Sequence, residues 1–454
     1  MTFQSINPAN GELLAEYPAW DGAAVEQALA QAAAAAPAWA ATPLTQRCEL
    51  MRRAAAVLRE RREALARTIT LEMGKLRQEA LAEVDKCALG CEYYAEHGPA
   101  FLADEVIASD AGKSFVAWQP LGTVLAVMPW NFPLWQVFRF AAPALVAGNT
   151  GLLKHASNVP QCALAIEAVF RDAGFPDGVF RSLMITASQV DGVIRDARVH
   201  AVTLTGSEPA GRKVAAAAGE CLKKSVLELG GSDAFVVLED ADLDWTVQQA
   251  VASRFLNGGQ SCIAAKRFIV VDAIAGQFLP RFQAAVEALR HGDPMNEATT
   301  LAPLARPDLR DELHRQVSDS IAAGAVALTG CKPVEGSSNF YQPSILDEVR
   351  PGMRAYAEEL FGPVAIVIRA RDEVDAVRIA NDSRFGLGGS VWTTDSARGE
   401  RVARQLECGC AFVNGLVKSD PRLPFGGTKA SGYGRELSLL GMREFLNAKT
   451  VWVR

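Results

Sequence analysis

The chain has 454 residues, of which 49% are hydrophobic and 22% are charged. A chain of this length and composition is expected to bury more than one core and to form two or more domains. The formal net charge of −6, with lysine and arginine scattered along the chain, argues against nucleic acid and anionic membranes as partners.

The N-terminal sequence MTFQSINPANGELL has neither the basic nor the apolar segment of a signal peptide, and no apolar run reaches the ~18 residues of a membrane span. A cytoplasmic location is therefore predicted. The nine cysteines have no framework spacing, so reduced thiols are expected. The cysteines and the five histidines also form no metal-ligand pattern, which predicts no metal site.

Helical periodicity dominates the N-terminal part of the chain. Asp21 can cap the alanine-rich segment AAVEQALAQAAAAA, and amphipathic segments follow at about residues 46 to 73 and 75 to 97. Many arginines lie in CELMRRAAAVLRERREAL, where they alternate with leucine and alanine at helical spacing. This pattern favours a solvated helix face over a binding site for an acidic partner.

The periodicity then changes from helix to strand in FVAWQPLGTVLAVM. The segments TGLLKHASN, RSLMI, AVTLTGS and SVLELGG are predicted strands that alternate with helices, one of which spans about residues 160 to 173. This alternation is typical of a parallel sheet in a doubly wound α/β fold. Such a sheet binds a dinucleotide at the carboxyl ends of its strands.

Gly206 and Gly211 frame a predicted helix start directly after the strand AVTLT. Free backbone N–H groups at such a start can hold a pyrophosphate. The spacing is not the common GxGxxG fingerprint, and taken alone it is also typical of a tight strand-to-helix turn. Both interpretations stay open at this point.

A second α/β unit is predicted to begin near Gly231. It contains the strand AFVVLED, the helix WTVQQAVASRFL and the strand KRFIVV, followed by predicted strands in LFGPVAIVIRA, SVWTT and CAFVNG. No low-complexity linker separates the two units, so close packing is expected. The final TVWVR is short and β-prone and is expected to pair with another strand, with a simple edge strand as the alternative.

Three residues in separate segments are candidates for catalysis. Cys262 follows the glycine-rich NGGQS, where a substrate can approach the sulfur, although an isolated cysteine is more often a buried small hydrophobe. Asn131 is fixed between two prolines in PWNFP, which suits an oxyanion donor. Glu228 ends an apolar run in KSVLELGG, where a carboxylate could serve as a general base.

The motifs PWNFP, ELGG, GQSC, EELFGPV and PFGGTKASGYGRE occur in this order along essentially the whole chain. Together they resemble the NAD(P)-dependent aldehyde dehydrogenase superfamily, and most of all its succinate-semialdehyde dehydrogenases. The resemblance implies a Rossmann-like dinucleotide-binding domain at residues 1–97 and 120–229 and an α/β catalytic domain at residues 230–443. It also implies a homodimer or homotetramer, with oligomerisation strands at residues 98–119 and 444–454.

The resemblance further implies that Cys262 attacks an aldehyde, that the Asn131 amide and the Cys262 N–H hold the oxyanion, and that Glu228 activates the hydrolytic water. NAD or NADP is the implied cofactor. The residues implied to contact it are Trp130, Asn131, Lys154, His155, Ala156, Ser157, Gly206, Ser207, Leu229, Glu359 and Phe361. Ser157 stands where NAD-preferring relatives often carry a glutamate, which predicts that NADP⁺ is accepted, alone or alongside NAD⁺.

A carboxylate-bearing aldehyde is predicted from Arg139, because about two helical turns would bring this side chain to the side of Asn131. An arginine in an apolar tunnel needs an anion, and a substrate carboxylate would supply one. A surface or salt-bridged arginine is the alternative. Leu256 and Asp420 depart from the resembled pattern at positions where an arginine and a serine can stand, and Arg422 is predicted to supply the missing contact.

Other functions stay open. They are an acylating dehydrogenase that passes the acyl group to coenzyme A, an aldehyde dehydrogenase of broad aliphatic specificity, and an inactive binding protein of the same fold. Glu228 favours hydrolysis over transfer to coenzyme A, since acylating enzymes generally lack a base at the ELGG position.

Overall fold

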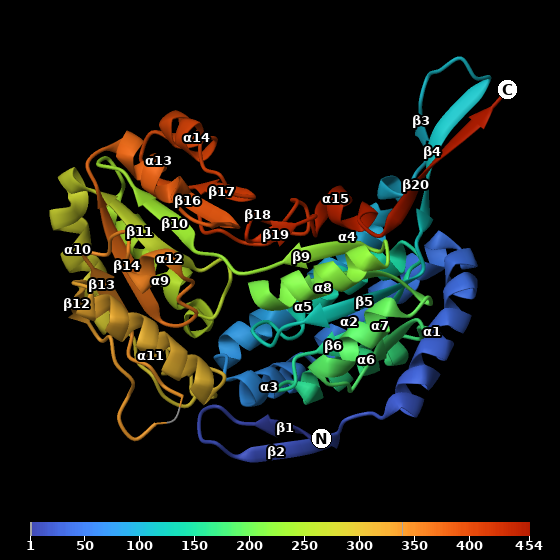
Figure 1. Cartoon of the computed structure of the whole chain (residues 1–454), viewed down its shortest axis with the longest axis horizontal. Helices are drawn as coiled ribbons and strands as arrows, with labels where there is room; N and C mark the ends of the chain where they lie inside the picture. The colour runs from blue at the N-terminus through green and yellow to red at the C-terminus, as the bar shows by residue number, and fades with distance from the viewer. Residues whose placement is uncertain (1, 338) are drawn as a thin grey trace.

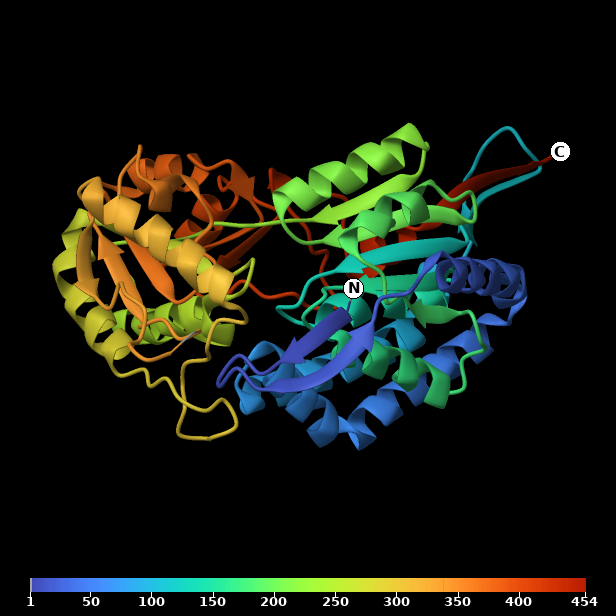
Figure 2. The ribbon, with the colours of Figure 1, turned by 60° about the horizontal axis from the view of Figure 1, so that its bottom comes forward.

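The computed structural model describes residues 2–337 and 339–454 and contains two large β-sheets with helices packed against them. Figure 1 shows the two α/β units side by side, with a narrow sheet projecting from one of them at the C-terminus. The turned view in Figure 2 shows the same two units, with the N-terminal hairpin in front. The predicted α/β fold with doubly wound parallel sheets is confirmed.

The first sheet is parallel except at one edge and has the strand order β19-β9-β8-β5-β6-β7. Its carboxyl edge brings together chain segments that are far apart in sequence, since Met128 pairs with His155 and Thr205 with Glu228. The strands are β5 (Thr123–Met128), β6 (Thr150–His155), β7 (Phe180–Ser182), β8 (Val199–Thr205), β9 (Lys224–Glu228) and the antiparallel β19 (Gly432–Tyr433).

Helices cover both faces of this sheet (Figure 1). Asp21 caps the first of them as predicted, because its Oδ1 accepts from Ala24 N at 2.9 Å. The single amphipathic segment expected at residues 46 to 73 is two helices, since Arg61 leaves helical geometry and both halves pack on α4. The helices are α1 (Gly22–Ala41), α2 (Leu44–Glu60), α3 (Arg62–Met73), α4 (Arg77–Phe101), α5 (Trp135–Val146), α6 (Pro160–Asp172), η1 (Ala187–Gln189), α7 (Val190–Arg195) and α8 (Glu208–Glu220).

The second sheet has the order β12-β13-β14-β11-β10-β16-β17 and is parallel except for β12. Its strands are β10 (Asp233–Val237), β11 (Ala265–Val271), β12 (Val326–Thr329), β13 (Ser344–Asp347), β14 (Val364–Ala370), β16 (Gly388–Trp392) and β17 (Cys410–Val413). Its helices are α9 (Leu243–Phe255), η2 (Leu256–Gly259), α10 (Asp272–Glu287), α11 (Pro307–Ala322), α12 (Arg354–Ala357), α13 (Glu373–Asn381) and α14 (Ser396–Ala403).

The C-terminal strand β20 (Leu446–Val453) pairs antiparallel with β4 (Lys113–Pro120), so the final TVWVR pairs with another strand as expected. Together with β3 (Glu105–Val106) these strands form the sheet that projects from the molecule in Figure 1. The remaining elements are the hairpin β1 (Thr2–Ile6) and β2 (Leu13–Pro18), the pair β15 (Phe385–Gly386) and β18 (Thr428–Lys429), and α15 (Ser438–Arg443). The division of the chain into domains at residues 97, 119, 229 and 443 stays a prediction.

Each sheet has an apolar core of its own. One core lies between the first sheet and helices α2 to α6, a second surrounds β10, β11 and β14, and a smaller one lies under α1, α7 and α8. All nine cysteines are free. No helix in residues 2–337 and 339–454 has the length and apolar character to cross a membrane. Within the same residues, no group of three or more His, Cys, Asp or Glu side chains could hold a metal ion.

Candidate active site

A cavity of about 780 Å³ contains Cys262 and is walled by α4, α5, α9, η2 and three loops. Most of its wall is apolar, but three cationic side chains also line it. The lining residues are Lys86, Phe132, Trp135, Gln136, Arg139, Ala252, Ser253, Leu256, Ser261, Cys262, Ile263, Ala264, Leu416, Val417, Lys418, Ser419 and Phe425. Cys262 is therefore accessible from a cavity large enough for a small organic molecule.

The loop before Cys262 has a backbone that few residue types adopt. Asn257, Gly258 and Gly259 have φ values of 56°, 61° and 75°, in the left-handed region that glycine and asparagine tolerate best. The Gln260 side chain then anchors the turn, because its Nε2 donates to Asn257 O and its Oε1 accepts from Ala305 N at 2.8 Å. These contacts hold Cys262 in position ahead of β11.

Asn131 follows β5, and it both donates a hydrogen bond to the cysteine loop and accepts one from it. Its Nδ2 donates to Gln260 O at 3.1 Å, and its backbone O accepts from Asn257 Nδ2 at 2.8 Å. One Asn131 amide hydrogen remains, and the Cys262 backbone N–H has no hydrogen-bond partner in the described residues. Two N–H donors, one on Cys262 itself and one on the side chain hydrogen-bonded to its loop, are thus not otherwise engaged, as an oxyanion site requires.

Lys266 holds the cysteine loop through hydrogen bonds to its backbone. Its ammonium is buried, donates to the backbone oxygens of Ser261 and Cys262 at 2.7 Å each, and lies 3.2 Å from a Glu359 carboxylate oxygen. Burial raises the pKa of the Cys262 thiol to about 12, while the charges of Lys266 and Arg139 act to lower it. The resting thiol is therefore protonated at neutral pH.

Glu228 ends β9 as a fully buried carboxylate beside a charged pair. Neither of its oxygens has a hydrogen-bond partner in the described residues. Burial raises the pKa of Glu228 well above its ordinary value, with the Arg139 charge opposing and the Glu436 charge adding to this effect. A buried carboxylate with free oxygens and a raised pKa has the properties of a general base.

Arg139 lines the cavity, but its charge is balanced within the protein. Its side chain is 2% exposed and forms an ion pair with Glu436, which is 5% exposed. One terminal nitrogen also donates to Thr205 Oγ1 at 3.3 Å. The salt-bridged alternative describes this side chain, so the premise that Arg139 needs a substrate anion does not hold. Its assignment to the substrate stays a prediction.

Arg422 is not brought to the cavity. Its side chain is 73% exposed and makes a two-pronged contact with Asp420, at 2.8 and 2.6 Å. Asp420 does not line the cavity either, whereas its neighbour Ser419 does. The serine expected at position 420 is thus present one residue earlier, at Ser419, which lines the cavity.

The residues predicted to hold a dinucleotide lie along the carboxyl edge of the first sheet. Ser207 precedes α8 and leaves its hydroxyl free of a capping bond, so the first N–H groups of the helix are open to an anion. Gly211 allows α8 to approach Leu229, since a Cβ there would lie 2.5 Å from Leu229 Cδ2. Lys154 at the end of β6 has no acidic partner in the described residues, and burial lowers its pKa.

A second group of predicted cofactor residues makes contacts among loops of both α/β units. Trp130 and Phe361 meet edge to face at 5.8 Å, and Glu359 Oε1 accepts from Gly231 N at 3.1 Å. Ala156 and Ser157 follow β6, with Ser157 exposed. An anion-accepting helix end, an unpaired ammonium and a fixed carboxylate fit a dinucleotide with a phosphorylated ribose.

His155 differs from the rest of this group. Its ring is buried, contacts Pro133 O at 2.8 Å through Nε2, and accepts from Ala156 N through Nδ1. Burial lowers its pKa to about 4. Both ring nitrogens are thus engaged in holding the PWNFP loop against β6, which leaves only the backbone of His155 for a cofactor.

Comparison with known proteins agrees with this geometry. The model of the aldehyde dehydrogenase family matches residues 1–451. The chain belongs to the aldehyde dehydrogenase family. It is 50% identical over 453 residues to a probable NADP(+) succinate-semialdehyde dehydrogenase from Synechocystis sp., with 100% of both chains covered. It is 51% identical over 449 residues to an Escherichia coli NAD(P)+ succinate semialdehyde dehydrogenase, covering 99% of this chain and 97% of that one.

Solved aldehyde dehydrogenase structures share the fold over the full length. The crystal structure of succinic semialdehyde dehydrogenase from Streptococcus pyogenes, in complex with NADP+, superposes with a TM-score of 0.98 at 37% identity, covering 99% of each chain.

Several residues around this aldehyde dehydrogenase site were not predicted from the sequence. Lys86 and Ser419 line the cavity, Lys266 holds the cysteine loop, and Glu79 accepts from Asn257 N at 3.0 Å. No motif around them indicates a role, because each acts through a contact with a distant segment. The only local hint for Lys86 is that a lysine occupies an interior-facing position of a predicted helix, where a charge is unusual.

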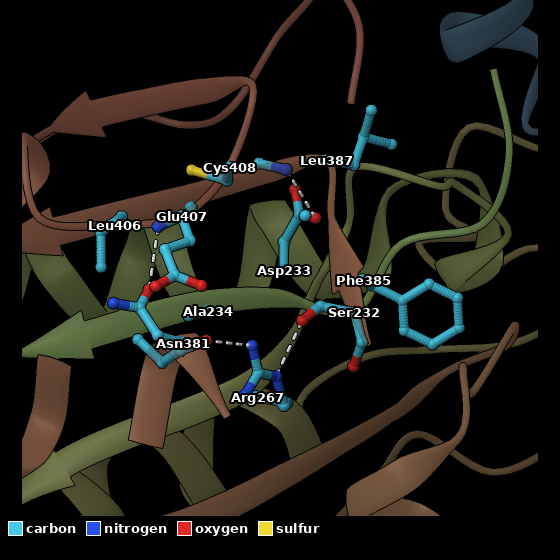
Figure 3. Close-up of a pocket in the computed structure, with 14 residues that line it drawn as sticks. Ser232, Asp233, Ala234, Arg267, Asn381, Phe385, Leu387, Leu406, Glu407 and Cys408 are labelled. Atoms are coloured by element: carbon cyan, nitrogen blue, oxygen red, sulfur yellow. Dashed lines mark hydrogen bonds between the residues drawn. The ribbon is translucent and has the colours of Figure 1, made fainter. Parts of the chain in front are cut away.

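Figure 3 shows a different and smaller cavity, of about 280 Å³, at the amino ends of β10 and β16. Asp233 Oδ1 accepts there from Gly388 N at 3.0 Å, and Arg267 donates to backbone oxygens, including Ser232 O at 2.8 Å. Its lining does not include Cys262 and shares no residue with that of the Cys262 cavity. These polar contacts hold the second sheet together and do not belong to the catalytic cavity.

Proposed function

We propose that this chain oxidises succinate semialdehyde to succinate, with NADP⁺ as the electron acceptor. The observation that carries the proposal is the cavity, in which an accessible cysteine shares a mostly apolar wall with the ammonium groups of Lys86 and Lys418 and with the ion-paired Arg139. Such a wall suits a short aldehyde with an anionic end. The names of the Synechocystis and Escherichia coli relatives support this substrate and cofactor.

In the proposed reaction the Cys262 sulfur bonds to the aldehyde carbon, and the carbonyl oxygen takes the negative charge. The free Asn131 amide hydrogen and the Cys262 N–H are the donors available to that oxygen. The thiol is protonated at rest, so its proton must leave as the sulfur attacks. Glu228 is the candidate acceptor, because it is a buried base with free oxygens.

The residues that would hold NADP⁺ lie beside this site, and the bound cofactor would supply a hydride acceptor for the carbon attached to sulfur. Lys154 and the exposed Ser157 would bind its ribose and 2′-phosphate, since neither position carries an acidic group that would repel the phosphate. The open start of α8 at Ser207 would bind the pyrophosphate. Glu359, held by Gly231 N, would bind a ribose hydroxyl.

The thioester left on Cys262 is then hydrolysed. Glu228 first releases the proton taken from the thiol to solvent and then takes a proton from water as the hydroxide bonds to the thioester carbon. The carbon–sulfur bond breaks, Glu228 returns its proton to the sulfur to regenerate the thiol, and the acid leaves as the carboxylate after it loses its own proton to solvent. The raised pKa of Glu228 makes the ionised carboxylate a stronger base than an exposed glutamate. No acyl acceptor other than water is needed, and coenzyme A takes no part.

We also propose that the enzyme is a cytoplasmic homodimer or homotetramer assembled through the sheet of β3, β4 and β20. Its side chains leave an apolar surface exposed: Val106 is 75% and Trp452 is 53% exposed. Exposed apolar strands at a sheet edge favour association with another chain. Light scattering of the purified protein tests this, and a monomer at micromolar concentration would contradict it.

The test of the function is an assay of the purified chain with succinate semialdehyde and either NADP⁺ or NAD⁺, following reduced nicotinamide and succinate together. Equal amounts of both products are expected without coenzyme A. A requirement for coenzyme A would identify an acylating enzyme instead, and a preference for uncharged aldehydes over succinate semialdehyde would contradict the proposed substrate.

A further inference from the structure

Lys266 is a buried cation that contacts the backbone on both sides of Cys262. It is the second residue of β11, and its side chain is 1% exposed. Its Nζ donates to Ser261 O and to Cys262 O, at 2.7 Å each, and lies 3.2 Å from Glu359 Oε1. An ammonium has three hydrogens, so these three oxygens engage all of them and fix its position.

The two backbone contacts hold the conformation of Cys262 itself. Ser261 O and Cys262 O belong to the two peptide groups that flank the Cys262 Cα. Each peptide group is planar, so a bond that holds its oxygen holds the whole group. The φ and ψ angles of Cys262 describe how these two groups are turned about the Cα. One ammonium therefore sets the direction of the Cα–Cβ bond that carries the sulfur.

The contact with Ser261 also acts on the oxyanion donor. Ser261 O and the Cys262 N–H are the two ends of one trans peptide group, so they point in opposite directions. The bond from Lys266 to the oxygen thus directs the N–H away from the ammonium, and this N–H has no partner in the described residues. A charge-assisted bond to the oxygen also polarises the peptide group, which makes its N–H a stronger donor.

The surroundings of Lys266 exclude a direct contact with the substrate. Lys266 does not line the Cys262 cavity. Its acidic partner Glu359 is held by Gly231 N at 3.1 Å, and Gly231 also leaves room for the Cys262 oxygen, since a Cβ there would lie 2.6 Å from that oxygen. Any effect of Lys266 on the reaction therefore passes through the backbone of the cysteine loop.

A second lysine makes the same kind of contact away from the site. Lys223 donates to Ile194 O and Asp196 O, at the end of α7. It precedes β9, whereas Glu228 stands at the opposite end of that strand. Lys223 is therefore a matched control for an ammonium that holds two backbone oxygens and supports structure alone.

We propose that Lys266 is a positioning residue for the nucleophile, and that its hydrogen bonds to Ser261 and Cys262 direct and polarise the N–H that holds the oxyanion. The inference rests on the proposed reaction, in which an oxyanion forms beside Cys262. Because Lys266 has no contact with the aldehyde, its loss should affect acidic and uncharged aldehydes alike.

The test compares two reactions of Cys262 in the absence of cofactor. With para-nitrophenyl acetate the sulfur bonds to the acyl carbon, an oxyanion forms, and para-nitrophenolate leaves; with iodoacetamide the sulfur displaces iodide and no oxyanion forms. Both reactions need the thiolate. The ratio of their rate constants at one pH therefore cancels any change in the thiol pKa, which burial raises and the Lys266 charge lowers.

Release of para-nitrophenol measures the acylation, with Cys262→Ala as the background, and mass spectrometry of the Cys262 peptide measures the alkylation. In Lys266→Met the ratio of acylation to alkylation is expected to fall by about 10- to 100-fold, because one oxyanion donor is misdirected and weakened. Lys266→Gln keeps a neutral donor and should give an intermediate ratio. Lys223→Met should stay within about twofold of the wild-type ratio.

Turnover gives a second readout. In Lys266→Met, kcat should fall by the same factor on succinate semialdehyde and on butanal, with KM little changed, because the oxyanion forms only during the reaction. An unchanged ratio of acylation to alkylation, or equal slowing of both thiol reactions, would overturn the proposal. If Lys266→Met does not fold, Lys266→Gln decides, and a wild-type ratio in that variant would overturn it equally.

The thiol reactions need neither an aldehyde nor NADP⁺, so the two proposals fail separately. A wild-type enzyme whose Cys262 is acylated by the ester, but which oxidises no aldehyde, would reject the proposed function, and the ratio would still report on Lys266. An active dehydrogenase whose Lys266→Met variant keeps the wild-type ratio would reject the role of Lys266 alone. A wild-type Cys262 that is alkylated but never acylated has no working oxyanion site, which would also overturn that role.

Discussion

The turn that holds Cys262, called the corner below, and the two lysines Lys86 and Lys154 differ in how completely the protein engages their polar groups. At the corner, Asn131, Gln260 and Lys266 are held by backbone contacts that leave little freedom. The two lysines have no acidic partner in the described residues, and burial lowers the pKa of each. The comparison shows that backbone contacts fix the loop of Cys262, whereas the two lysines keep ammonium hydrogens that no acidic group in the described residues engages.

Arg139 resembles the corner more than the lysines, because protein groups engage its charge. Its ion pair with Glu436 and its proximity to Glu228 place one cation between two buried carboxylates. Such a cluster is stable only while the cation is present, because each buried carboxylate is costly to ionise by itself. Its contacts tie Arg139 to Glu436 and place its charge near Glu228.

The largest effect is expected at the corner, from Cys262→Ala. Without the sulfur no covalent adduct forms, so hydride transfer should fall by on the order of 10⁴-fold or more. Stopped-flow measurement of reduced nicotinamide checks this. Substantial steady-state turnover by this variant would end the mechanism proposed for the corner.

Glu228→Gln should separate the two halves of the reaction. Acylation remains possible, and hydrolysis should slow by about 10²–10⁴-fold, which gives a burst of reduced nicotinamide near one equivalent per site followed by slow turnover. Because the base works when ionised and its pKa is raised, wild-type kcat should increase with pH through that raised pKa and then level off. The variant should lose this increase; an unchanged pH profile would assign the base elsewhere.

Arg139→Leu should act on stability and on both aldehydes alike. Removing the cation leaves Glu436 buried without its partner, which is expected to reduce the free energy of unfolding by about 3–5 kcal/mol. Denaturant unfolding, together with kcat on succinate semialdehyde and butanal, checks this. A stable variant that loses activity on succinate semialdehyde only would move Arg139 into the group of anion-binding cations and restore the prediction made from sequence.

Ser157→Glu is expected to have the smallest effect, at the cofactor end. A carboxylate beside Lys154 would supply the missing acidic partner and repel a 2′-phosphate, so the NADP⁺ to NAD⁺ ratio of kcat/KM should fall by about 10- to 100-fold. Kinetics with both cofactors at fixed aldehyde measure this ratio. A ratio equal to that of the wild type would show that Lys154 and Ser157 do not read the phosphate.

The local sequence pattern was sufficient to predict most helices and strands and the position of some site residues along the chain. The change from helical to strand periodicity predicted β5 to β9, and the α/β alternation predicted the parallel sheets that the structure contains. It also predicted that Asn131 follows one strand and that Glu228 ends another. Since the carboxyl ends of parallel strands meet at one edge, residues at those ends come together without any long-range information.

Only the tertiary structure decided which charges are balanced. Arg139 pairs with Glu436 from the C-terminal segment, and Lys86 meets Ser419 at a sequence separation of 333 residues. No periodicity or motif records such contacts, because they depend on how the two sheets and α4 pack against one another. The sequence by itself determined that Asn131 follows a strand, that Glu228 ends a strand and that Cys262 follows a glycine-rich turn. Packing determined which charges are paired, since a charge is free only when its surroundings fail to neutralise it.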